Sequence, residues 1–349
     1  MAEFCGDKKR TYREEQAIFP TRFRRNLLVA FLGFMLFFPF IGFTHLLYLS
    51  IMIGISIIGA LGINILTGAT GLISLGHGAF IGVGAYSSAI LVSKLSFPFW
   101  AALPAAGAIT CFIGLVFGIP SLRVKGLYLA MATLAAQVIL HFLMVNWEGL
   151  TGGVYGYTVP TARIGPIAFD TDTRYYYLVL VLVFVFVLST KQLFRTKNGR
   201  AYIAIRERDI AAEVIGVSLF KYKLQSFAIG SFYAGISGSL LAHYLSVITP
   251  NNFPLSLSIE YLAMIIVGGL GSVLGSIMGA CFITLLPEFL NSVMSVLGGV
   301  FPNIASLLPH VKMISFGLII IAFLILEPRG LAEIYQRVKK FFKLWPYAY

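Results

Sequence analysis

The charged stretch Arg195–Lys223, RTKNGRAYIAIRERDIAAEVIGVSLFKYK, separates two large blocks of apolar sequence and sets the organisation of the chain. Its central part, Arg200–Gly216, is predicted to be one amphipathic helix, because apolar residues recur at roughly helical spacing and charged residues occupy the other faces. The apolar set comprises Ala201, Ile205, Ala212 and Ile215. The turn-forming pair Asn198-Gly199 marks the start of this helix. Two interpretations are open: a solvated loop, or a docking element for another protein.

The composition indicates that lipid surrounds most of the chain. Of 349 residues, 58% are hydrophobic and only 11% are charged. A soluble domain has about 25% charged residues. Because a backbone in lipid must satisfy its own hydrogen bonds, long apolar segments of this kind are expected to be helices. The predicted fold class is therefore an all-α integral membrane protein.

The net charge of +12 comes from basic residues that lie mostly between the apolar blocks. They gather in the N-terminal arm (residues 1–25), in a short loop at 121–125, around the charged stretch at 191–223, and in the tail at 329–349. An excess of Lys and Arg in short loops marks the cytoplasmic side of a membrane protein. If these four groups face the cytoplasm, topology explains the charge and no nucleic-acid partner is required.

The apolar blocks divide into about ten predicted spans, each close to the ~20 residues needed to cross a bilayer. The spans cover residues 27–43, 46–66, 67–93, 99–119, 126–145, 175–188, 224–248, two tightly joined helices within 259–290, and 311–326. They form a transmembrane domain over 26–328, with an external loop at 146–174, a cytoplasmic loop at 191–223 and both termini in the cytoplasm. Eight or nine spans with re-entrant segments are the alternative.

Two segments rich in small residues interrupt these spans, one in each half of the chain. Residues recur at a spacing of four in both: Ser74, Gly78 and Gly82 in the first, and Gly271, Gly275 and Gly279 in the second. Small residues at this spacing usually let helix backbones pack closely. Interrupted spans in corresponding places also indicate a transport route, because unwound backbone is tolerated only where it lines protein or water.

Candidate residues for a translocation path follow from the second interpretation. They are Thr70, Gly71, Ser74, His77 and Gly78 in the first segment, Gly268, Gly269, Gly271 and Ser272 in the second, and Thr151, Gly152 and Gly153 in the external loop. His77 is included because an ionisable side chain at membrane depth is by default a functional candidate. The alternative is a structural histidine that donates to a backbone carbonyl, and the loop glycines equally permit a tight turn.

The sequence contains no G-x-x-x-x-G-K-[ST] motif for nucleotide phosphates and no hydrolase motif, so catalysis by this chain is not expected. Cys5, Cys111 and Cys281 show neither metal-ligand nor redox spacing, and neither a metal nor a bound cofactor is predicted. The spans are almost free of Asp, Glu and Lys, which an ion-driven transporter is expected to bury. This scarcity favours a passive channel, or a permease that other chains power.

Five blocks in the expected order resemble the LivM-type permease subunits of branched-chain amino acid ABC importers, over roughly residues 57–330. The blocks are GINILTGATGLISLGHGAFIGVGAY (62–86), KGLYLAMATLA (125–135), LTGGVYG (150–156), GRAYIAIRERDIAAEVIGVSLFKYKLQSFAIGSFYAGISGSL (199–240) and IEYLAMIIVGGLGSVLGSIMGA (259–280). The same family includes urea and short-chain amide importers. Branched-chain amino acids are therefore the favoured substrate, with urea or an amide as the alternative.

The resemblance implies partners and a location in the bacterial inner membrane. The partners are a second permease subunit of similar fold, two cytoplasmic ATPase subunits that bind the ATP, and a periplasmic substrate-binding protein. Glu207–Gly216 is similar to the coupling segment that docks into a groove of an ATPase. The residues assigned to coupling are Arg206, Glu207, Arg208, Asp209, Ala211, Ala212, Glu213 and Gly216. Docking is then the favoured interpretation of the charged stretch.

Overall fold

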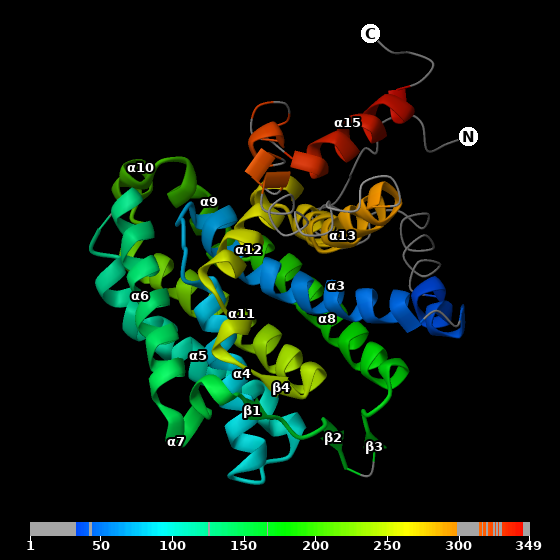
Figure 1. Ribbon diagram of the computed structural model, residues 1–349. Coiled ribbons are helices and arrows are strands. Elements are labelled where there is room, and N and C mark those ends of the chain that lie inside the picture. Colours follow the sequence, from blue (N-terminus) through cyan, green and yellow to red (C-terminus); the bar gives the residue numbers. More distant parts are fainter. Residues whose placement is uncertain are drawn as a thin grey trace.

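The computed structural model describes residues 33–41, 44–124, 126–165, 167–298 and 330–344, together with 314–315, 317–318, 320–323, 325 and 327. These residues form a bundle that is almost entirely helical (Figure 1). The longer helices are α3 (Thr44–Ile63), α4 (His77–Ser93), α5 (Phe99–Ser121), α6 (Leu127–Asn146), α8 (Asp172–Arg195), α9 (Lys197–Glu207), α11 (Leu219–Leu245), α12 (Leu255–Gly268), α13 (Val273–Gly298) and α15 (Gly330–Leu344).

Shorter elements connect these helices. They are the 3₁₀ turns η1 (Phe38–Ile41), η3 (Gly153–Tyr155) and η4 (Pro250–Asn252), the π-helical turn η2 (Asn64–Ala69), the short helices α7 (Glu148–Thr151) and α10 (Asp209–Val214), and the two-residue strands β1 (Tyr157–Thr158), β2 (Arg163–Ile164), β3 (Ile167–Ala168) and β4 (Val247–Ile248). Strand β1 pairs antiparallel with β4, and β2 pairs antiparallel with β3.

Among the described residues, five helical segments are long and apolar enough to cross a membrane. They are Thr44–Ala69, Phe99–Ser121, Leu127–Asn146, Asp172–Arg195 and Val273–Ser292. The helical membrane fold is thus confirmed, whereas the total of ten spans and the side on which the termini lie stay predictions. The spans predicted at 27–43 and 311–326, the arm at 1–25 and the end of the tail fall largely outside the described residues.

The two interrupted spans differ in how well they match expectation. The joint predicted within 259–290 is present, because α12 ends at Gly268 and α13 begins at Val273. The span predicted at 67–93 is helical only in its second part, since α4 begins at His77. Its 17 residues extend only about 26 Å at 1.5 Å per residue, which is less than a typical hydrocarbon core.

Helix α11 lies in the middle of the described bundle and packs against α3, α4 and α5. Glycines bring its backbone close to α4: a Cβ added at Gly238 would overlap the carbonyl of Ile81, and one at Gly84 would overlap Gly235. Close backbone approach is a usual way to pack helices in lipid, where apolar burial provides little drive for association. Small residues at every fourth position from Gly230 to Gly238 are the sequence signal for this contact, which we did not single out.

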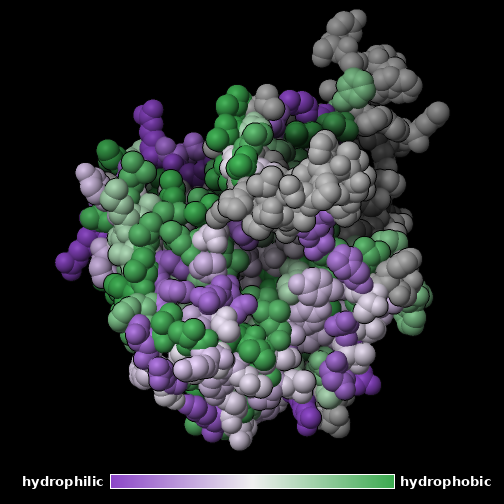
Figure 2. All heavy atoms as spheres, viewed as in Figure 1, coloured by the Kyte–Doolittle hydropathy of each residue, from purple (hydrophilic) through white to green (hydrophobic). Residues whose placement is uncertain are grey.

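The connections gather at two opposite ends of the bundle (Figure 1). Helices α9, α10 and α15 lie at the upper end in this view, and α7 with β1, β2 and β3 lies at the lower end. Large hydrophobic side chains of α5 and α6, among them Phe112, Met131 and Phe142, are more than half exposed. Figure 2 shows hydrophobic residues over the α6 side and hydrophilic ones at the edge near α10, which fits a lipid-facing flank below a polar end.

Candidate functional site

The first interruption follows α3. The helix widens into the π-helical turn η2, ends at Ala69, and the chain then runs without regular helix to His77. Side chains inside this segment satisfy its backbone: Thr67 Oγ1 donates to the Leu72 carbonyl at 2.9 Å, and the Thr70 hydroxyl donates to the carbonyl one turn earlier. Non-helical backbone at membrane depth is stable only when its polar groups are satisfied in this way.

The second interruption separates α12 from α13 and lies directly beside the first. Asn64, which is fully buried, joins them: its Oδ1 accepts from the Gly271 N–H at 2.8 Å, and its Nδ2 donates to the Ser272 carbonyl at 3.2 Å. The backbone of Gly271 has φ +78°, a conformation that favours glycine. Two segments about 200 residues apart in the sequence are therefore tied by one amide side chain.

The amino end of α4 is capped from two other helices. The Gly78 N–H donates to Ser258 Oγ at 2.7 Å, and the Ala79 N–H donates to Gln137 Oε1 at 2.6 Å. Gln137 in turn donates from Nε2 to the Phe253 carbonyl at 3.1 Å. The first N–H groups of a helix have no partner within it, so an uncapped end would bind an anion. Here side chains of α6 and α12 occupy two of these donors.

His77 is the first residue of α4 and is buried. Its Nε2 lies 2.9 Å from the Gly59 carbonyl, and its ring meets the edge of Tyr261 at a centroid distance of 5.3 Å. A carbonyl only accepts, so Nε2 carries the proton. This geometry matches the structural alternative for His77, and a role in translocation stays a prediction.

The sequence indicated two continuous helix faces of small residues, but the structure does not contain them. Ser74 lies in the loop before α4, so only Gly78 and Gly82 share a face. Gly78 packs against the start of α12 and Pro254 before it, and Gly82 packs against Met144 of α6 and Phe253. Gly271 lies before α13, whose Gly275 packs against the backbone at the end of α12. In each set of three small residues, the first one lies in the interruption and only the other two lie in the helix that follows.

The charged stretch forms two helices, so the single helix predicted over Arg200–Gly216 is wrong. Helix α9 ends at Glu207, Arg208 is extended with φ −155° and ψ 105°, and α10 starts at Asp209. An acidic residue in the first turn favours a new helix start through the helix dipole. The chain therefore bends at Arg208, immediately before Asp209.

The two helices differ in how they are held. Helix α9 buries Tyr202 and Ile205 in the bundle, and burial together with the nearby Tyr222 raises the pKa of the Tyr202 phenol to about 12. Helix α10 instead exposes apolar side chains: Ile210 is 71% exposed, and Val214 is 82% exposed. Ile215, which belongs to the apolar set predicted from the sequence, is also exposed. Helix α9 is thus packed on the bundle, whereas the large apolar side chains of α10 are exposed in the described part of the chain.

Arg206, near the end of α9, contacts both interruptions. Its Nη1 donates to the Gly68 carbonyl at 2.6 Å and lies 3.5 Å from the Leu270 carbonyl, which is at the limit of hydrogen bonding. Gly68 belongs to the last turn before the first interruption, and Leu270 belongs to the second. The structure thereby brings one predicted coupling residue against two predicted path segments.

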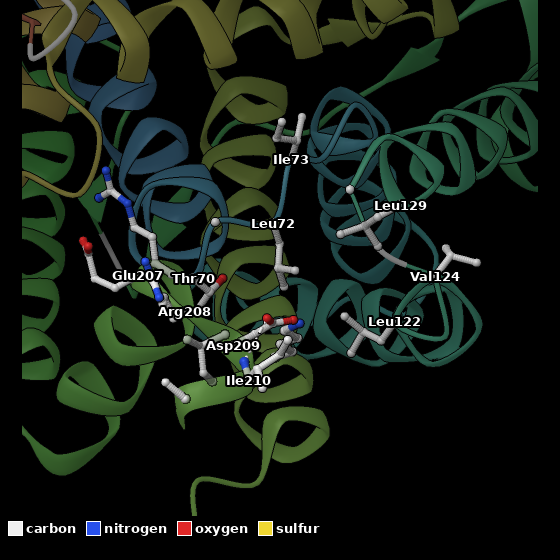
Figure 3. Close-up of a pocket in the computed structure, with 16 residues that line it drawn as sticks. Thr70, Leu72, Ile73, Leu122, Val124, Leu129, Glu207, Arg208, Asp209 and Ile210 are labelled. Atoms are coloured by element: carbon white, nitrogen blue, oxygen red, sulfur yellow. Dashed lines mark hydrogen bonds between the residues drawn. The ribbon is translucent and has the colours of Figure 1, made fainter. Parts of the chain in front are cut away.

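A cavity of about 610 Å³ opens between these elements. It is lined by Thr70, Gly71, Leu72, Ile73, Leu122, Val124, Gly126, Leu129, Ile205, Arg206, Glu207, Arg208, Asp209, Ile210, Ala211 and Lys223. Figure 3 shows Leu72 and Ile73 on the first interruption between the charged residues of the α9–α10 bend and the apolar side chains of the α5–α6 connection. The cavity is therefore charged on one wall and apolar on the other.

The other predicted coupling residues lie around the bend. Glu207, Arg208, Ala211, Glu213 and Gly216 are exposed, Asp209 is half-buried, and Ala212 is buried. The predicted path residues Ser74, Gly78, Gly268, Gly269 and Ser272 pack around the two interruptions, where Gly269 adopts φ +119°. The predicted set thus gathers at one end of the bundle, with one exception.

The exception is the segment with Thr151, Gly152 and Gly153. It follows α6, whose 20 residues separate it from the cavity by about 30 Å at 1.5 Å per residue. Thr151 Oγ1 donates to the Met144 carbonyl at 2.8 Å, and both glycines have positive φ. The structure therefore does not bring these residues to the rest of the predicted path, and their geometry is that of a tight turn.

Three residues that organise the site were missed in the sequence: Asn64, Gln137 and Ser258. Each is a polar residue inside an apolar predicted span, and that isolation is a usable signal, since buried polar groups must find partners. Their partners could not be read from the sequence, because they lie more than 50 residues away. In the described part of the chain, no group of three or more His, Cys, Asp or Glu residues is placed to hold a metal ion.

Apolar helices, two interrupted helices that meet inside the bundle, and a charged helix pair at one end define a multi-pass membrane transport protein. The chain belongs to the family described as "Branched-chain amino acid transport system / permease component", which it matches over residues 45–324. It is a transport subunit of that family, as the resemblance of its five blocks had indicated.

Named relatives agree with this family. The chain is 32% identical to the high-affinity branched-chain amino acid transport system permease protein LivM of Salmonella typhimurium and 33% identical to that of Escherichia coli, in each case over 79% of this chain and 72% of the relative. A probable LivM protein of Methanocaldococcus jannaschii is 24% identical over 63% of this chain and 64% of the relative. No solved structure matches the chain significantly.

Proposed function

We propose that this chain is a permease subunit of an ATP-binding-cassette importer in a bacterial inner membrane, and that it moves branched-chain amino acids inward by alternating access. The observation that carries the proposal is the α9–α10 pair. Helix α10 presents exposed Ile210 and Val214 beside charged residues, and α9 connects it to both interruptions through Arg206. An apolar helix face with a charged border fits a groove on a partner protein.

In this proposal the energy comes from other chains. The sequence has no phosphate-binding loop, so two cytoplasmic ATPase subunits would bind and hydrolyse the ATP. A second permease subunit of similar fold would complete the path, and a periplasmic binding protein would deliver the solute. The α9–α10 end would then face the cytoplasm, and the loop with β1, β2 and β3 would face the periplasm, as the distribution of Lys and Arg predicts.

The proposed motion begins at α10. When the ATPase subunits close, they would displace α10, while Tyr202 and Ile205 keep α9 packed on the bundle. The movement would pass to the two interruptions, whose non-helical backbone can rearrange without unwinding a complete helix. The cavity bounded by Thr70 and Arg206 is then the cytoplasmic mouth on this subunit.

The substrate assignment rests on the family and on the names of the relatives, which specify branched-chain amino acid transport. The polar groups at the interruptions bond mainly to one another, so they leave few donors to recognise a solute. Selectivity would then depend largely on the binding protein. Urea or a short-chain amide in the same architecture is the alternative, and a passive channel is a further one.

The test is reconstitution of the chain with a second permease subunit, ATPase subunits and a substrate-binding protein from the same organism. We expect leucine, isoleucine or valine, but not urea or acetamide, to stimulate ATP hydrolysis and uptake into liposomes. Combined Arg208→Glu and Glu213→Arg substitutions should abolish stimulation, and Arg200→Glu, an exposed site on α9, serves as the matched control. Uptake by liposomes that contain this chain alone would instead support the passive channel.

A further inference from the structure

Arg206 occupies a position that its assignment as a docking residue does not explain. The residue is exposed on the cavity wall, yet its guanidinium donates to the Gly68 carbonyl at 2.6 Å and lies 3.5 Å from the Leu270 carbonyl. The Gly68 carbonyl belongs to the last turn of η2, which ends at Ala69, whereas Leu270 lies two residues past the end of α12 at Gly268. Carbonyls in the last turn of a helix lack partners within it and carry partial negative charge. A cation is therefore favoured beside the Gly68 carbonyl.

The backbone around the guanidinium is shaped to admit it. A Cβ added at Gly271 would lie 2.6 Å from Arg206 Nη1, too close for any real contact, and would push the guanidinium away. On the other side, a Cβ at Gly71 would lie at 3.6 Å from Arg206 Cγ, an ordinary contact. Gly271 thus serves two needs, its positive φ and the approach of Arg206.

The place of Arg206 along the chain makes it sensitive to α10. It lies two residues before the extended Arg208, where α9 gives way to α10. Tyr202, one turn earlier, is fully buried, whereas the apolar side chains of α10 are exposed. A force on α10 therefore acts at Arg206 before it reaches the anchored part of α9.

We propose that Arg206 is the positioning residue through which the α9–α10 pair holds the two interruptions in register, so that displacement of α10 moves both together. This inference rests on the proposed function and adds a specific connection to it. The short bond to Gly68 is the main link, and the longer contact to Leu270 is the weaker one. An ammonium group can donate to one of these carbonyls but is a point charge without the guanidinium plane, so lysine should restore only part of the link.

The experiment uses the complete reconstituted complex with Arg206→Met, Arg206→Lys and, as matched control, Arg200→Met on the exposed side of α9. Three quantities are measured: ATPase subunits retained on the permease, ATP hydrolysis, and solute transported per ATP hydrolysed. For Arg206→Met we expect bound ATPase and continued hydrolysis, but transport per ATP reduced about tenfold or more, the equivalent of one lost charge-assisted hydrogen bond. Arg206→Lys should recover part of this ratio, and Arg200→Met should match the wild type.

Two results would overturn the inference: a wild-type transport ratio in Arg206→Met, or loss of the ATPase subunits from it, which would make Arg206 a docking contact. If Arg206→Met does not accumulate, Gly271→Ala tests the same link with the arginine retained, against Gly165→Ala, which also places alanine at positive φ but has no atom within 4 Å. An unchanged ratio in Gly271→Ala would likewise overturn it. Failure of the proposed function is distinct, since the wild-type complex would then show no ATP-dependent uptake.

Discussion

Replacing Gln137 with leucine tests whether the capped start of α4 is a structural joint. The side chain of Gln137 is buried and makes three hydrogen bonds: it accepts from the Ala79 N–H at 2.6 Å and from Ser258 Oγ at 3.2 Å, and it donates to the Phe253 carbonyl at 3.1 Å. Leucine has a similar volume and none of these groups. The substitution therefore removes polar contacts with little change in packing.

Two estimates of the unfolding free energy that Gln137→Leu loses agree on the lower bound. Hydrogen bonds between membrane helices average about 0.6 kcal/mol in measured cycles, so three of them amount to about 2 kcal/mol. Alternatively, Gln137→Leu leaves the Ala79 N–H and the Phe253 carbonyl without these partners, and two buried unsatisfied groups at about 1–3 kcal/mol each give about 2–6 kcal/mol. We expect a loss of at least about 2 kcal/mol, because a helix end cannot satisfy its own first N–H groups.

The assay is equilibrium unfolding of the purified subunit in mixed micelles. Asn146→Leu is the matched control, since Asn146 lies on the same helix, is exposed, and donates only to the Phe142 carbonyl within it. Asn146→Leu should change the free energy of unfolding by no more than about 0.5 kcal/mol. Combining Gln137→Leu with Ser258→Ala should give less than the sum of the two losses, because the residues share one network. Equal losses for Gln137→Leu and Asn146→Leu would refute the reasoning.

Three further comparisons of variants concern Tyr202, Gly238 and His243. The Tyr202 hydroxyl is buried and has no hydrogen-bond partner among the described residues. Tyr202→Phe should therefore leave the free energy of unfolding unchanged or raise it, whereas Tyr202→Ala should lower it by about 3–5 kcal/mol. Chemical unfolding of the two variants measures the difference. Gly238→Ala should sharply reduce the folded yield in detergent, because its Cβ would overlap an α4 carbonyl, while Gly149→Ala, with no atom within 4 Å, should not. His243 bonds to Ser88 Oγ at 2.9 Å and to the Pro160 carbonyl at 2.8 Å, so His243→Phe should lower the thermal midpoint by more than Ser88→Ala, measured by retention of monodisperse protein after heating.

Much of the architecture could be predicted from local pattern alone. The bounds predicted at 99–119 and 126–145 differ from α5 and α6 by two residues or fewer. A single long apolar segment in lipid can satisfy its backbone hydrogen bonds internally only as a helix. The joint near Gly268–Ser272 was also predicted, since glycines there could not continue a helix cheaply. Local pattern is sufficient wherever a segment's own composition decides its conformation.

The parts that could not be predicted depend on contacts between distant segments. Arg208 takes an extended conformation although apolar residues recur around it at helical spacing. Helix α9 buries Tyr202 and Ile205 in the bundle, whereas α10 buries Ala212 but leaves Ile210 and Val214 exposed. Ser74 falls outside α4 because side chains from α6 and α12 cap that helix at Gly78 and Ala79. Spacing shows which residues could share a face, but not where a helix that is capped from outside will begin.

The mutual bonding of the two interruptions bears on how this subunit can switch. The two Asn64 bonds to Gly271 and Ser272 connect them directly, and the Arg206 bond to Gly68 ties the first one to α9. At about 1 kcal/mol for each neutral bond, breaking the two Asn64 bonds costs about 2 kcal/mol. A gap of a few kcal/mol between two conformations is the size that a binding partner can reverse. If α10 transmits force as proposed, contacts of this size would hold one state together and still be weak enough for a partner to release.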